Sequence, residues 1–162
     1  MIPTPNHTRG FTLLEVMIAL VIFSIGLLGL AGLQARGLQS NSTAQNRTTA
    51  MILAYDMADR LRANPAGVAA GDYNNLDSTN PTAGDCISAA CTAAQMATYD
   101  YYEWQQTINN ALPKGHGTVT GGATPPFTIT VMWDEERTGA TGTACSGNAS
   151  VDLKCYSMTF EP

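Results

Sequence analysis

The feature that most constrains the fold is an apolar run from Phe11 to Leu33, in which Thr12, Glu15 and Ser24 are the clearly polar residues. At 1.5 Å per helical residue, such a run covers roughly 35 Å, enough to cross the hydrocarbon core of a bilayer. A carboxylate costs about 3 kcal/mol at a bilayer centre. An ionisable residue in such a segment is therefore expected to have a function. The run therefore predicts a membrane-spanning helix in which Glu15 has a role of its own. The alternative is that Glu15 only compensates the helix dipole in the first turn.

The segment before the run is short and polar, and Pro3 and Pro5 make it a weak helix former. A secretory signal peptide has a shorter apolar stretch followed by a small-residue cleavage site. No obvious site of that kind follows Leu33, so we expect the apolar run to be retained.

Charge is distributed unevenly along the chain. Residues 63–162 carry ten acidic and three basic side chains. An acidic surface repels phosphate backbones, so we expect no direct binding of nucleic acid.

The four cysteines, Cys86, Cys91, Cys145 and Cys155, all follow the apolar run. An even number on one side of a membrane predicts disulfides in an oxidising compartment. Three pairings are possible, and we favour Cys86–Cys91 with Cys145–Cys155 because both close short loops and need no long-range geometry. Metal binding is the rival interpretation, but neither pair has the C-x-x-C spacing.

Helical character is expected to continue beyond the membrane segment to Arg62, because apolar residues recur there at helical spacing. They are Met51, Ala54, Tyr55, Ala58 and Leu61. Asn64 and Pro65 then end the helix.

The remaining chain predicts a small head that contains both helix and sheet. Residues 66–95 are rich in small and polar residues and are typical of a long surface loop. A helix is expected at about 97–112, and alternating patterns predict strands at 127–133 and near 156–160, with a weaker strand at 118–120. Two or three antiparallel strands laid on a long helix give an α+β fold.

The junction from Gly10 to Glu15, which reads Gly-Phe-Thr-Leu-Leu-Glu, resembles the class III leader site of type IV prepilins. The resemblance implies that a prepilin peptidase cuts between Gly10 and Phe11 and that Phe11 becomes the N-methylated first residue. It also implies that Glu15 is an assembly residue that pairs with the amine of a neighbouring subunit.

The layout downstream resembles the PilV-type minor pilins, or type IV pilus modification proteins. The resemblance rests on the helix around Trp104, the segment 112–117, the strand ending at Trp133 and the cysteine pair around the last strand. It implies a low-abundance subunit that primes or caps the pilus with other minor pilins and the major pilin, with a tip adhesin as a further partner. It also implies roles in twitching motility and adhesion.

These expectations divide the chain into a leader (1–10), a transmembrane and assembly half of the helix (11–33), a periplasmic half (34–64) and a globular head (65–162). The protein is then an inner-membrane, single-pass protein with a periplasmic head that later enters the pilus, at its tip. Two alternatives stay open. The chain could be a minor pseudopilin of a type II secretion system, or an adhesin module that binds through the loop at 66–95.

No enzymatic site is expected, and no cofactor or metal. His7 would leave with the leader, and His116 lies between two glycines in what is expected to be a solvated turn. The acidic residues 134–136 follow a strand and are expected to form a solvated turn, without EF-hand spacing. Trp104 and Trp133 lie on apolar faces, which favours core packing over sugar binding.

Overall fold

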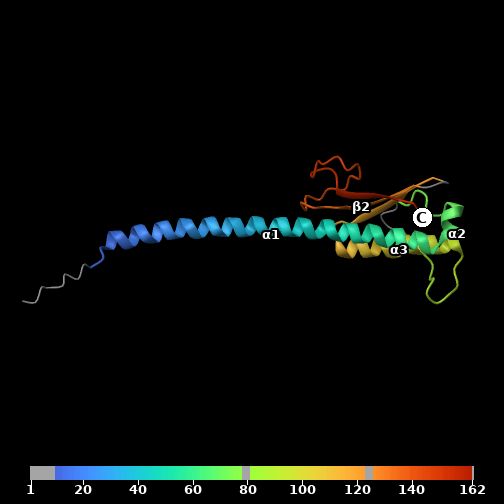
Figure 1. Ribbon diagram of the computed structural model, residues 1–162, viewed down its shortest axis with the longest axis horizontal. Coiled ribbons are helices and arrows are strands. Elements are labelled where there is room, and N and C mark those ends of the chain that lie inside the picture. Colours follow the sequence, from blue (N-terminus) through green and yellow to red (C-terminus); the bar gives the residue numbers. More distant parts are fainter. Residues whose placement is uncertain (1–9, 78–80, 123–125, 162) are drawn as a thin grey trace, which may run out of the picture. The chain divides into compact units, whose positions relative to one another are not determined.

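The computed structural model describes residues 10–77, 81–122 and 126–161, which form three helices and three strands (Figure 1). The helices are α1 (Leu13–Ala63), α2 (Pro65–Ala70) and α3 (Ala93–Ala111). The strands are β1 (His116–Thr120), β2 (Phe127–Trp133) and β3 (Lys154–Phe160). The chain divides into two compact units at the boundary between Ser42 and Thr43.

In the first unit, the described residues are the start of α1 and the three residues before it. An 18-residue window of α1 has a mean hydropathy of 2.6, and none of it is buried. By length and composition, α1 is the one helix among the described residues that could cross a membrane. The run of large apolar side chains from Phe11 to Leu33 is exposed, as a segment meant for a bilayer requires.

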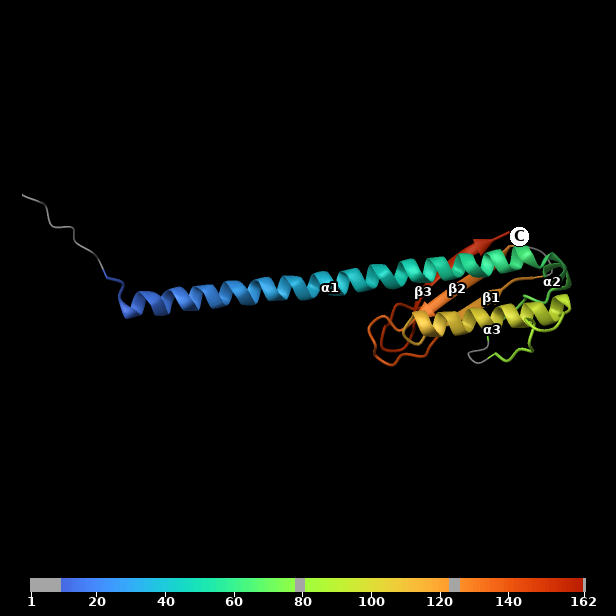
Figure 2. The same cartoon turned by 90° about the horizontal axis from the view of Figure 1, so that it is seen from below.

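The second unit is an α+β head in which the last part of α1 and the antiparallel α3 lie side by side beneath one sheet (Figures 1 and 2). The sheet order is β1-β2-β3, with both pairs antiparallel. Ile129 at the centre pairs with Val119 on one side and Met158 on the other. The predicted fold class is confirmed.

The core of the head lies between the sheet and the two helices, and most of its members were expected from the apolar periodicity. Met51 and Tyr55 were expected on the apolar face of α1, but they are 38% and 52% exposed. They include Leu53, Met57, Leu61, Tyr73, Tyr101, Trp104, Ile108, Val119, Phe127, Ile129, Val131 and Trp133. The predicted core positions of Trp104 and Trp133 are confirmed, since both side chains are almost fully buried.

Capping residues move the helix boundaries away from the expected ones. The interpretation of 66–95 as one loop is wrong at both ends. Asn64 accepts a hydrogen bond from the Gly67 backbone N–H and caps α2, which has Pro65 in its first turn. Thr92 and Gln95 form a capping box that starts α3 at Ala93, four residues earlier than expected.

Helix α3 approaches β1 closely, and a glycine makes this possible. A Cβ at Gly117 would lie 2.5 Å from both Trp104 and Ile108 side-chain atoms. Tyr101 adds a hydrogen bond of 2.8 Å from its hydroxyl to the Gly117 carbonyl. The segment around 115–117 is therefore a packing element, and its backbone is held against α3.

Candidate processing and assembly site

The junction at the start of α1 places the proposed scissile bond outside the helix. Helix α1 begins at Leu13, two residues later than expected. Thr12 ends the non-helical segment, because its Oγ1 accepts a hydrogen bond of 3.3 Å from the Glu15 N–H and its carbonyl accepts bonds from Glu15 and Val16. The Gly10–Phe11 bond therefore lies in non-helical chain. Phe11 is 84% exposed, and apart from Gly10 and its chain neighbours no heavy atom of the described residues lies within 4 Å of a Cβ built on Gly10.

Glu15 lies in the first turn of α1, where the helix dipole favours a negative charge. Its neighbours are nonetheless apolar. One shallow groove of the first unit is lined by Phe11, Glu15, Val16, Ala19, Leu20 and Phe23. The spacing of four residues puts Glu15, Ala19 and Phe23 on one face of the helix. The carboxylate thus lies in an apolar groove that a second helix could fill.

The three polar residues of the apolar run differ in how they are satisfied. Thr12 bonds the first turn of the helix, and the Ser24 hydroxyl donates a 2.7 Å hydrogen bond to the Leu20 carbonyl. A hydroxyl that bonds to its own helix can be accommodated in a bilayer. Among the described residues, the ion pairs involve other carboxylates and none includes Glu15. Glu15 is therefore the polar residue of the run that needs a partner from elsewhere.

In the head, a buried polar network joins the end of α1 to α3. The Asp100 carboxylate accepts a 2.5 Å hydrogen bond from the Tyr73 hydroxyl and a 3.3 Å ion-pair contact from Arg60. Arg60 also pairs with Asp56 at 3.1 Å, the i,i+4 pair that the sequence predicts. Asn64 donates to the Tyr73 hydroxyl at 3.1 Å and to a carbonyl of α3 at 2.8 Å. Periodicity gives no signal for Tyr73, because it lies in the segment expected to be a loop.

The connection between β2 and β3 is organised by two carboxylates and a disulfide. Both oxygens of Asp134 accept backbone N–H bonds, from Thr138 at 3.1 Å and Gly139 at 2.8 Å. Asp134 is 4% exposed, so the expectation of a solvated turn is wrong there. Hydrogen bonds from Ser146 lower the pKa of Asp152. The structure contains the disulfides Cys145–Cys155 and Cys86–Cys91.

His116 is not in a solvated turn, and that expectation is also wrong. It begins β1 opposite Met132 and is 5% exposed. Burial lowers its pKa, although Asp77 acts in the opposite direction, and its Nδ1 has no hydrogen-bond partner among the described residues. The described residues contain no cluster of three or more side chains suited to hold a metal ion.

Comparison with known proteins places two family profiles on adjoining parts of the chain. Residues 5–31 match the prokaryotic N-terminal methylation motif, and residues 32–102 match a profile described as type IV pilin Tt1218. The chain is also 39% identical over 57 residues to type II secretion system protein I of Pseudomonas aeruginosa. That match covers 35% of this chain and 44%, less than half, of the relative. No solved structure matches the chain significantly.

Proposed function

We propose that the chain is a type IV pilin-like protein and that it acts as a minor pilin, which helps to prime or cap fibre assembly. The type IV pilins are structural, non-enzymatic proteins. The methylation motif implies processing by prepilin peptidase and association with pilus or pseudopilus components. The apolar helix suggests membrane anchoring before assembly.

In the proposed pathway, cleavage between Gly10 and Phe11 removes residues 1–10, of which all but Gly10 lie outside the described residues. The amine of Phe11 is then methylated. Residues 11–33 hold the subunit in the inner membrane, while 34–64 and the head at 65–162 lie in the periplasm. The two disulfides support an oxidising location for the head.

The main support for the proposal is the apolar environment of Glu15. Thr12 and Ser24 are satisfied by their own helix, but Glu15 lies in an exposed apolar groove with no ion pair among the described residues. A carboxylate in hydrocarbon is stabilised by a cation, and cleavage creates one at Phe11 of each subunit. We propose that Glu15 pairs with the methylated amine of a neighbouring subunit. Such buried pairs specify geometry better than they add stability, which suits a residue that sets axial register.

The PilV-type assignment rests on the sequence layout around Trp104, 112–117 and Trp133. The proposed partners are therefore other minor pilins, the major pilin and a tip adhesin, and the proposed outcome is support of twitching motility and adhesion. The proposed position is the pilus tip, because a subunit that primes assembly is incorporated first.

A second candidate, a minor pseudopilin of a type II secretion system, is favoured by the match to type II secretion system protein I. The two candidates differ in what is lost on deletion of the gene. Loss of surface pili with normal secretion supports the minor pilin. Loss of secreted enzymes with normal pili supports the pseudopilin.

The role of Glu15 is tested by Glu15→Ala in a strain with active prepilin peptidase. We expect the leader to be removed as in the wild type, whereas co-purification with partner pilins from solubilised membranes falls sharply. Ser24→Ala is the matched control, because the Ser24 hydroxyl is already satisfied by Leu20 and its loss should leave co-purification unchanged. Equal recovery of partners with Glu15→Ala and Ser24→Ala would contradict the proposal.

A further inference from the structure

The segment 81–92, which we call the disulfide loop, projects from the head just before α3 (Figures 1 and 2). It contains no regular helix or strand, and its residues are exposed or half-buried. A loop with so little contact to the core keeps one conformation only when bonds within the loop hold it.

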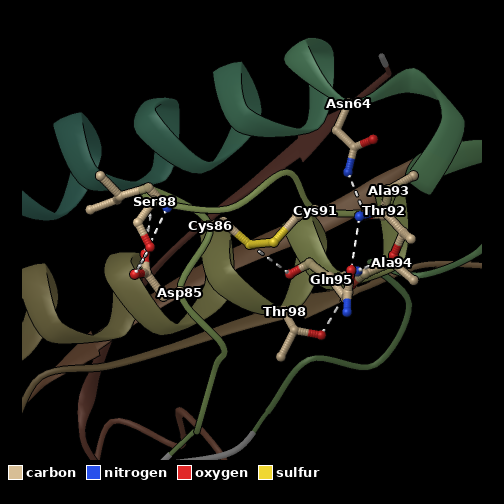
Figure 3. Close-up of a disulfide and its surroundings, with 11 residues drawn as sticks. Asn64, Asp85, Cys86, Ser88, Cys91, Thr92, Ala93, Ala94, Gln95 and Thr98 are labelled. Atoms are coloured by element: carbon tan, nitrogen blue, oxygen red, sulfur yellow. Dashed lines mark hydrogen bonds between the residues drawn. A yellow bond between two sulfur atoms is a disulfide. The ribbon is translucent and has the colours of Figure 1, made fainter.

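The disulfide loop is held by local bonds at its tip and its base, as Figure 3 shows. The Cys86–Cys91 disulfide closes the tip. Directly before Cys86, Asp85 Oδ1 accepts backbone N–H bonds from Ile87 at 2.8 Å and Ser88 at 3.1 Å, and the Ser88 hydroxyl donates to the other oxygen. At the base, Cys91 directly precedes Thr92, the N-cap of α3. The loop is therefore preorganised.

This preorganised tip presents an apolar side chain to solvent. Ile87 is 84% exposed, more than the other exposed large apolar residues in the described part of the head, such as Val151 at 56%. A single exposed isoleucine is common on protein surfaces. What distinguishes Ile87 is that its backbone is already fixed, so a partner that buries it loses little loop entropy.

Beside the tip lies a hollow of about 460 Å³ between the disulfide loop and the first turns of α3. Small residues, including Ala83, Gly84 and Ala89, leave it open, and Asp85, Gln95 and Thr98 give it polar atoms. The bonds from Ser88 and Ile87 lower the pKa of Asp85, which keeps the carboxylate charged at neutral pH. The described residues that line the hollow include no aromatic ring.

We propose that the disulfide loop docks on a protein whose surface offers an apolar recess for Ile87 and a lysine or arginine for the hollow beside Asp85. Charge complementarity selects this partner, since the head is acidic and residues 63–162 carry only three basic side chains. The contact lies entirely in the head and is separate from the pairing of Glu15, so either can fail without the other.

The test uses the full chain expressed in its own host, with the photo-crosslinking residue p-benzoylphenylalanine in place of Ile87. We expect one discrete protein adduct, in which the crosslinked peptide carries a lysine or arginine close to apolar residues. The same probe in place of Val151, another exposed apolar residue of the head, is the matched control and should not yield this adduct.

Two variants carrying the probe then separate the parts of the contact. Asp85→Asn keeps an oxygen for the turn but removes the charge, and the adduct yield should fall about threefold, as for an exposed ion pair. Cys86→Ser with Cys91→Ser should largely abolish the adduct in a head that still unfolds cooperatively, although loss of this disulfide should cost about 2 kcal/mol on the chain-entropy argument. The proposal is overturned by no protein adduct, by an adduct to lipid or glycan, by a crosslinked peptide without a basic residue, or by a yield that neither variant lowers.

Discussion

The hydroxyl of Tyr73 should contribute measurably to the stability of the head. It is fully buried and donates a 2.5 Å hydrogen bond to Asp100, a carboxylate that also faces Arg60. Burial, then the bond to Asp100, raises the pKa of Tyr73, so the hydroxyl stays protonated and acts as the donor. A hydrogen bond to a charged acceptor contributes about 1.5–3 kcal/mol, and its removal leaves the carboxylate short of a donor. We expect Tyr73→Phe to cost about 2 kcal/mol of unfolding free energy.

The assay is urea denaturation of a fragment that starts at Thr43, where the second compact unit begins. Trp104 and Trp133 are buried, so their fluorescence reports unfolding. A loss of 2 kcal/mol would also lower Tm by roughly 8 °C for a domain of this size. Tyr55→Phe is the matched control, because Tyr55 is 52% exposed on α1, and it should change the unfolding free energy by less than about 0.5 kcal/mol.

A double-mutant cycle with Asp100→Asn separates the hydrogen bond from general packing. Partners in one network couple by about 0.5–3 kcal/mol, so the two single costs should not add. A cost of Tyr73→Phe no larger than that of Tyr55→Phe, or additive costs of Tyr73→Phe and Asp100→Asn, would show that the Tyr73–Asp100 hydrogen bond does not stabilise the head.

Three further predictions concern the head. Burial lowers the pKa of His116 in the folded state. The stability it contributes is therefore complete above its unfolded pKa of about 6.5 and is lost as pH falls through the lower folded pKa. His116→Gln should flatten this part of the pH–stability profile measured by denaturation, and an unchanged profile would contradict the lowered pKa. Gly117→Ala should cost about 1–3 kcal/mol by overpacking against α3, whereas Gly84→Ala, in open space, should be almost neutral in the same assay. Removal of the Cys145–Cys155 disulfide by double serine substitution should cost about 3 kcal/mol on the chain-entropy argument; a denaturation midpoint equal to that of the wild type would show that the β2–β3 connection needs no covalent closure.

Much of the fold follows from local patterns in the sequence. The alternation of Phe127, Ile129, Val131 and Trp133 predicts a strand with one buried face, and all four are buried. The long apolar run and the helical spacing after it predict one continuous helix, which α1 is. Such patterns are reliable because the same period decides both the hydrogen bonding and which face is buried.

Features that depend on distant parts of the chain were not predictable in this way. Alternation alone would place Met132 on the outer face of β2, but it is 2% exposed, as is Trp133 beside it. Neighbouring strand residues point to opposite faces, so both faces of the sheet are covered at this end. The same covering explains why His116 is buried despite its flanking glycines. Asp134 was misjudged because the backbone N–H groups that hold it belong to a turn with no periodic signal.

The candidate site could be predicted from the sequence only in part. The spacing of Gly10, Phe11 and Glu15 identifies the junction, but it does not show whether each polar group is satisfied within the helix. That Thr12 and Ser24 are satisfied by their own helix, while Glu15 lies in an apolar groove, requires the three-dimensional arrangement of α1. Thr12 could have been recognised as the N-cap, since Thr-x-x-Glu before an apolar run is a capping-box pattern.

The proposed pairing of Glu15 requires the amine that cleavage would create at Phe11. Intact-mass spectrometry of the protein purified from membranes of a strain with active prepilin peptidase measures it. This proposed pairing predicts the mass of residues 11–162 with two disulfides and one added methyl group, and fragmentation should place that methyl group on the Phe11 amine. A mature protein that still contains residues 1–10, or one that begins at a residue other than Phe11, would contradict it.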